Sequence, residues 1–167
     1  MGHHLDAFVA RPEVLQRLAP GICGLRILAL PQGIALAPIP EALRPAGEDE
    51  PGGPPGTLVI TSALAEIAAE VSRTGPIGWI ETDWFGGHGE SRAVLWRCGV
   101  CEDLGDVNPL LRALGVVRVP APPSDGPLGP LVKRLVLPRL MDEWDSIGLA
   151  LWRSADSAYA KATPVIE

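Results

Sequence analysis

The stretch "IGWIETDWFGGHGESRAVLWRC", residues 77–98, decides the fold class of this chain. Its two ends, "IGWIETD" (77–83) and "SRAVLWRC" (91–98), contain β-branched and aromatic residues typical of strands. The seven residues between them, "WFGGHGE" (84–90), include three glycines and predict the connection of an antiparallel hairpin. We infer the rest of the fold outward from this hairpin.

Further strands and helices flank the hairpin. Two apolar runs, 25–30 and 33–39, are separated by Pro31-Gln32-Gly33 and predict a second pair of strands, and "VVRV" (116–119) predicts a short one. Apolar residues recur at helical spacing in four further segments: 12–18, 62–74, 109–114 and much of the chain after 130. Strands in the middle with helices at both ends predict an α+β fold, a central antiparallel or mixed sheet with helices packed on one side.

Helix ends are predicted from residues whose side chains accept hydrogen bonds from backbone N–H groups. Thr61 or Ser62 is expected to cap the helix over 62–74, Asn108 the next helix, and Ser154 the last one. Near the C-terminus, the helical segment "MDEWDSIGL" (141–149) carries three acids that we expect on a solvated face: Asp142, Glu143 and Asp145.

Length and composition favour one folded unit. The chain has 167 residues, of which 47% are hydrophobic and 20% charged, so it can bury a sizeable core and is expected to form a single domain over 1–167. Nineteen glycines and 18 prolines exclude long helices throughout. Pro- and Gly-rich stretches at about 44–56 and 120–130 are expected to be loops within that domain.

Charge and hydropathy narrow the classes of partner. The formal net charge of −6 opposes binding to nucleic acid or to an anionic membrane and favours a basic surface on another protein. Apolar stretches are interrupted before they could span a bilayer, and the N-terminus lacks the features of a secretory signal, so we expect a cytoplasmic protein. Cys23, Cys98 and Cys101 do not describe a disulfide framework.

The acidic glycine-rich turn is the candidate functional site. Alternation along the first strand places Ile77, Trp79, Glu81 and Asp83 on one face, which becomes acidic towards the end of the strand. We predict a partner-binding surface, with no catalytic residue, metal or cofactor, formed by Glu81, Asp83, Trp84, Phe85, His88 and Glu90. Trp84 is equally compatible with an exposed anchor and with a core position.

Three alternatives accompany this interpretation. The turn is also compatible with polar residues that simply face water, or with a small metal-assisted hydrolase that uses Asp83, His88 and Glu90. A third possibility is a structural subunit of a larger assembly.

The Cys98-x-x-Cys101 motif follows a strand and precedes acidic residues, which raise a thiol pKa, so we interpret both as ordinary cysteines near a strand turn.

Three motifs in order resemble a known pattern: "ETDWFGGHGESRAVLW" (81–96), "DVNPLLRALGV" (106–116) and "DEWDSIGLALWRSAD" (142–156). Together they resemble an uncharacterised family of small bacterial cytoplasmic proteins, over roughly residues 57–160. Size, acidity and expected architecture are similar to those of immunity or accessory proteins encoded beside bacterial toxins. By this analogy the chain is expected to be a non-enzymatic binding protein of that kind.

Overall fold

The computed structural model describes residues 3–43, 60–85, 88–120, 143–147 and 154–165. The hairpin expected from the sequence forms two neighbouring strands of an antiparallel sheet. The strands are β1 (His3–Ala10), β2 (Arg26–Ala29), β3 (Ala35–Pro38), β4 (Ile77–Phe85), β5 (His88–Arg97), β6 (Val100–Asp103) and β7 (Thr163–Pro164). The helices are α1 (Pro12–Leu15), α2 (Ser62–Val71), α3 (Val107–Ala113), α5 (Glu143–Ser146) and α6 (Ala155–Lys161), with 3-10 turns η1 (Gln16–Gly21), η2 (Pro31–Gly33) and η3 (Glu41–Leu43).

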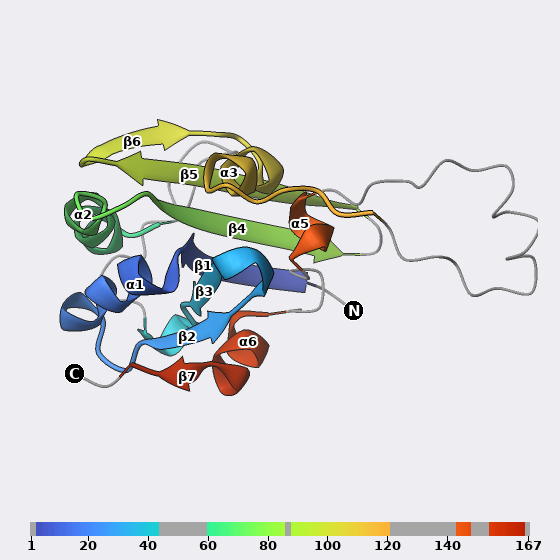
Figure 1. Ribbon diagram of the computed structural model, residues 1–167. Coiled ribbons are helices and arrows are strands. Elements are labelled where there is room, and N and C mark those ends of the chain that lie inside the picture. Colours follow the sequence, from blue (N-terminus) through green and yellow to red (C-terminus); the bar gives the residue numbers. More distant parts are fainter. Residues whose placement is uncertain (1–2, 44–59, 86–87, 121–142, 148–153, 166–167) are drawn as a thin grey trace, which may run out of the picture.

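The strands are arranged in the order β6-β5-β4-β1-β3-β2-β7, and every neighbouring pair is antiparallel (Figure 1). The predicted α+β class with an antiparallel sheet is confirmed. The sequence analysis missed β1, although this strand lies at the centre of the sheet. Its residues Leu5–Ala10 are all buried, so the strand shows none of the alternation by which half-buried strands are recognised.

Helices cover both faces of the sheet, so the expectation that they pack on one side is wrong. On one face Phe8, Trp79 and Val94 belong to a core that includes the buried residues of α1 and α2. On the other face Ala7 and Ile80 belong to a core with α3, α5 and α6. The first core includes an edge-to-face contact of Phe8 and Trp79, whose ring centroids lie 4.9 Å apart at 70°.

Local residue choices explain where the helices begin and how closely they pack. Thr61 caps α2 through a hydrogen bond from the Leu64 N–H, and Ser154 caps α6, as predicted. Asp106, rather than Asn108, caps α3. A Cβ on Gly78 would lie 2.5 Å from a Leu110 methyl group, so the absence of a side chain lets α3 approach β4.

Several expected boundaries differ from the structure. β4 continues to Phe85 and β5 begins at His88, so the strands are longer and their connection shorter than the predicted seven residues. The segment 116–119 is not a strand, since side chains rather than a neighbouring strand bind the Val117 and Val119 N–H groups. The loops expected at 44–56 and 120–130 lie outside the described residues, apart from Pro120. No helix in the described ranges is long and apolar enough to cross a membrane.

Candidate functional site

The β4–β5 hairpin brings the predicted acidic residues onto one face of the sheet. Asp83 lies opposite Glu90, and Glu81 lies opposite Arg92. β1 pairs with the other edge of β4 and adds two positions to the same face, because cross-strand partners project to the same side. We call the resulting group the acidic patch: His4, Asp6, Glu81, Asp83, Glu90 and Arg92.

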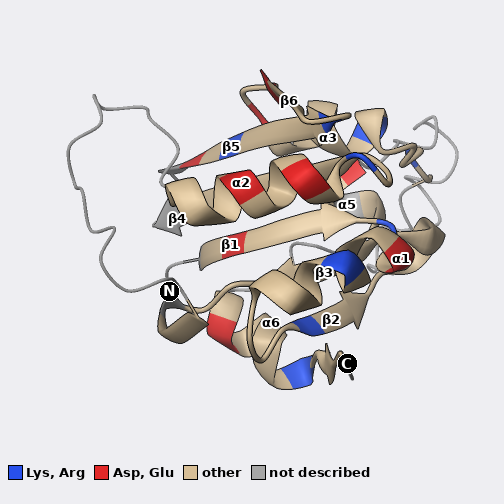
Figure 2. Ribbon diagram, turned by 90° about the vertical axis from the view of Figure 1, so that its left-hand side faces the viewer, with Lys and Arg blue, Asp and Glu red and all other residues tan. Residues whose placement is uncertain are grey.

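The acidic patch continues the face of the sheet that α2 covers. Two residues further along each strand, Phe8, Trp79 and Val94 belong to the core that contains the buried residues of α2. Figure 2 shows acidic residues on β1 and also on α2, where Glu66 and Glu70 are exposed. The acidic surface is therefore wider than the hairpin alone.

The charges of the patch are unevenly matched. Arg92 pairs with Glu90 at 3.0 Å, and the His4 Nε2 atom lies 3.3 Å from an oxygen of Asp6, whose side chain is buried. Asp83 is exposed, and its side chain has no hydrogen-bond or ion-pair partner in the described part of the chain. Glu90 is also exposed, so two carboxylates face solvent directly opposite each other on neighbouring strands.

The other predicted contact residues are placed only by their backbone. Trp84 and Phe85 end β4 and His88 begins β5, and their side chains lie outside the described residues. Among the side chains that are described, no group of three His, Cys, Asp or Glu residues is arranged to hold a metal ion. The hydrolase alternative requires the His88 side chain, which lies outside the described side chains.

The Cys98-x-x-Cys101 motif lies at the two-residue turn between β5 and β6. Cys98 and Gly99 have φ angles of +50° and +83°, a combination typical of a tight hairpin turn. The Cys98 N–H donates to the Ser72 carbonyl and the Gly99 N–H to the Ser72 hydroxyl, which anchors the turn on the end of α2. Burial and, to a lesser extent, Asp103 raise the pKa of the Cys101 thiol, which favours the protonated and less reactive form.

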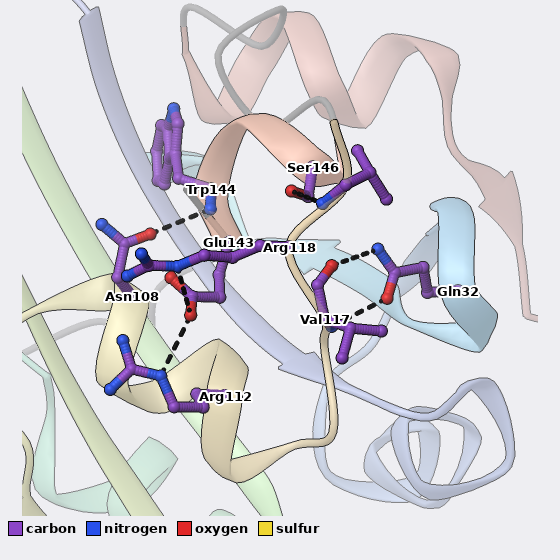
Figure 3. Close-up of polar contacts among 9 residues, drawn as sticks. Gln32, Asn108, Arg112, Val117, Arg118, Glu143, Trp144 and Ser146 are labelled. Atoms are coloured by element: carbon purple, nitrogen blue, oxygen red, sulfur yellow. Dashed lines mark hydrogen bonds and ion pairs between the residues drawn. The ribbon is translucent and has the colours of Figure 1, made fainter. Parts of the chain in front are cut away.

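The three sequence motifs meet in space through polar contacts. Ser91 of the first motif donates a hydrogen bond to Asp106, the cap residue that begins the second. Asn108 of the second motif accepts a hydrogen bond from the Trp144 N–H of the third, at 2.9 Å. Asn108 therefore binds the first turn of α5 instead of the helix that the sequence suggested (Figure 3).

A second charged group, which the sequence analysis missed, lies where the second and third motifs meet. Glu143 accepts hydrogen bonds at 3.0 Å from the Nε atoms of both Arg112 and Arg118 (Figure 3). We call these three residues the Glu143 cluster. Its carboxylate is 3% exposed, so the expectation that Glu143 lies on a solvated helix face is wrong. Asp142 and the Asp145 side chain lie outside the described residues.

Burial and polar contacts change the pKa of Glu143 in opposite directions. Burial, the larger single effect, raises its pKa, because it disfavours the charged form. Hydrogen bonds from the Arg112 and Arg118 side chains and from the Glu143 backbone, together with the charge of Arg112, outweigh burial and lower the pKa from 4.5 to about 2. Glu143 is therefore charged at neutral pH, and two cations compensate for its burial.

Side chains distant in sequence also hold the segment that carries Arg118. The Gln32 amide both donates to the Val117 carbonyl and accepts from the Val117 N–H, each at 2.9 Å. The Ser146 hydroxyl accepts from the Val119 N–H at 3.0 Å. Gln32 itself adopts a left-handed φ of +64°, and no local sequence pattern pointed to this long-range contact.

Comparison of the chain with protein-family models, curated proteins and solved structures gives no match.

Proposed function

We propose that this protein is a non-enzymatic binding protein that docks on a basic surface of a partner protein through the acidic patch. The observation that carries the proposal is the exposed pair of Asp83 and Glu90 on neighbouring strands. Like charges directly opposite each other destabilise a sheet. A cationic group of a partner, lying over both carboxylates, would replace this repulsion with two attractions.

The distribution of positive groups within the patch supports a basic partner. Arg92 pairs with Glu90, and His4, which lies opposite Asp83 on β1, has its Nε2 atom 3.3 Å from an oxygen of Asp6, so neither is seen to form an ion pair with Asp83. On α2, Glu66 adds a further exposed carboxylate, whereas Glu70 is paired with Arg73 at 3.0 Å. A negative field speeds the encounter with a positively charged surface and selects against acidic ones. Trp84, Phe85 and His88, which adjoin the patch along the chain, are proposed as further contact residues.

The proposed cellular role is that of an immunity or accessory factor in the cytoplasm. It rests on the acidity and small size of the chain and on the resemblance of its three motifs, by analogy. Such a role requires an accessible surface that holds a partner without chemical turnover. An exposed acidic patch on the rigid frame of a hairpin suits that requirement.

A quantitative pull-down from the cytoplasmic extract of the source cell tests the proposal. The baits are the wild type, the charge-reversed variant D83K/E90K, and the control E102K. Glu102 is an exposed strand residue opposite Leu95, so it lies on the other face of the sheet. We expect a basic protein to be retained by the wild type and by E102K, and at least about tenfold less by D83K/E90K.

The purified partner is then titrated against the same three proteins at low and high salt. Affinity that falls with salt for the wild type and E102K supports docking between charged surfaces. Equal affinity of all three proteins would contradict a role for Asp83 and Glu90. If no basic protein is retained by any bait, the binding proposal fails. Sedimentation of the pure protein then tests one of the alternatives, a structural subunit of a larger assembly.

A further inference from the structure

Arg112 and Arg118 bind Glu143 in an unusual way. An arginine commonly pairs with a carboxylate through two parallel hydrogen bonds to both oxygens. Here both arginines use only Nε, and both Nε atoms bind the same oxygen, Oε1. The other oxygen of Glu143 has no hydrogen-bond partner within the described residues. The terminal N–H groups of the two guanidiniums are thus not used to hold the carboxylate.

The two guanidiniums also lie close together. Each Nε is 3.0 Å from the shared oxygen, so the two Nε atoms are separated by no more than twice that distance. Figure 3 shows the Arg118 guanidinium beside the Asn108 side chain and the Arg112 guanidinium below the Glu143 carboxylate in that view. The arginine side chains are 59% and 47% exposed, whereas the carboxylate between them is 3% exposed. A ligand from solvent can therefore reach the arginines but not the carboxylate that holds them.

Positive charge is in excess within the Glu143 cluster itself, although the whole chain is acidic. Two guanidiniums face one carboxylate, which leaves one unit of positive charge in the Glu143 cluster. Neither arginine has a further hydrogen bond or ion pair among the described residues. Holding both side chains by Nε also lowers the entropy lost when a ligand binds them.

The geometry points to a second binding site, in which Arg112 and Arg118 bind a phosphate group, free or as a monoester, and Glu143 is a positioning residue. A carboxylate ligand has two oxygens, and a bidentate pair with one guanidinium fork occupies both of them. A phosphate offers three or more terminal oxygens and so can use both forks. The site is independent of the acidic patch, because α3 and α5 lie on the opposite face of the sheet.

Nuclear magnetic resonance of the full chain tests this site. Inorganic phosphate and methyl phosphate are titrated separately at constant ionic strength, and acetate and chloride serve as comparison anions. We expect saturable shifts of the Arg112 and Arg118 side-chain signals with a phosphate and not with chloride. The phosphate species that binds more tightly identifies the source of the ligand.

Conservative variants distinguish phosphate binding at the two arginines from a general effect of phosphate on the charges of the protein. R118K and R112K each retain a cation beside Glu143 but lose a planar fork, so we expect phosphate affinity to fall at least about tenfold. R73K is the matched control, because Arg73 also pairs through Nε, with the exposed Glu70, and no other arginine of the described residues pairs with Glu70. We expect R73K to bind phosphate like the wild type.

Three results would overturn the inference. The first is the absence of saturable phosphate binding by the wild type, which needs no variant and therefore no assumption about folding. The second is acetate binding as tight as phosphate binding. The third is an equal loss of affinity in R73K and in both cluster variants, with amide spectra that show each variant folded.

Discussion

The acidic patch and the Glu143 cluster differ in whether their carboxylates are compensated by positive charge. In the cluster, two half-exposed guanidiniums compensate for one buried carboxylate, and all three side chains come from different segments of the chain. In the patch, two exposed carboxylates oppose each other on adjacent strands, and one of them, Asp83, has no partner among the described residues.

This difference distinguishes a charge that supports the fold from a charge that is available to a partner. Breaking the cluster leaves an uncompensated buried charge, which destabilises the folded state strongly. Altering the patch removes repulsion between solvated groups, which changes stability little and in the favourable direction. Stability measurements on matched variants therefore assign each region to one class, independently of any partner.

The largest expected effect is the loss of both cations of the cluster. In R112M/R118M the Glu143 carboxylate remains buried with no cation beside it, and we expect a loss of about 3 kcal/mol in the free energy of unfolding. Urea unfolding followed by circular dichroism measures this loss. Replacement of Glu143 by Met in the same protein should restore part of it, because no charge is then buried.

The control for this variant is R73M, which removes the exposed pair with Glu70 on α2. Exposed pairs contribute little, so we expect a change within about 0.5 kcal/mol. A loss in R73M as large as that in R112M/R118M would show that burial does not distinguish the cluster from ordinary surface pairs.

A second expected effect is on the acid stability of the protein. In the folded state the pKa of Glu143 is about 2, lowered from its ordinary value of 4.5. Its ionisation therefore stabilises the fold fully above about pH 4.5. This contribution is lost as the pH falls through the folded-state value of about 2. We expect the stability advantage of the wild type over E143Q to shrink on acidification across this range. A constant difference between the two proteins would contradict the assigned pKa.

A smaller effect is expected from the side chain that links the second and third motifs. Asn108 accepts the hydrogen bond of the Trp144 N–H at the start of α5. N108A should lower the free energy of unfolding by about 1 kcal/mol, the usual effect of losing a helix cap. S154A removes the local cap of α6, and its loss in the free energy of unfolding is the reference with which the loss in N108A is compared. If N108A has no effect while S154A does, the hydrogen bond of Asn108 does not help to hold α5 in place, and the contacts of Glu143 and Ser146 carry that role.

Sequence reasoning succeeded where structure is determined by neighbours along the chain. The helix over α2 follows from Leu64, Ala68 and Val71 at helical spacing after a threonine cap. The hairpin follows from two apolar runs around glycines, although the strands extend further than the polar residues of the turn suggested. The exposed position of Asp83, which the partner-binding prediction required, is also observed.

The missed features depend on residues that meet only after folding. β1 is buried on both faces and contains Asp6, so neither alternation nor a continuous apolar run marks it. The burial of Glu143 depends on Arg112 and Arg118, which lie 31 and 25 residues away in sequence. An isolated acidic helix segment gives no indication of these partners, and its common interpretation as a solvated face was wrong for this residue.

The smallest expected effect provides the sharpest contrast between the two regions. D83K places a cation opposite Glu90 and so replaces a like-charge pair with an opposite-charge pair. We expect the free protein to become more stable by up to about 0.5 kcal/mol at low salt, and the gain to disappear at high salt. Urea unfolding at the two salt concentrations measures both changes.

E102K carries the same change of charge on an exposed strand residue that faces Leu95 across the strands, so its stability should stay close to that of the wild type. A stabilised D83K that no longer binds the partner would show that Asp83 is retained for binding at the expense of stability, as at other functional sites. A destabilised D83K would instead show that the carboxylate supports the fold. The contrast with the Glu143 cluster would then disappear, because both groups of charges would be structural.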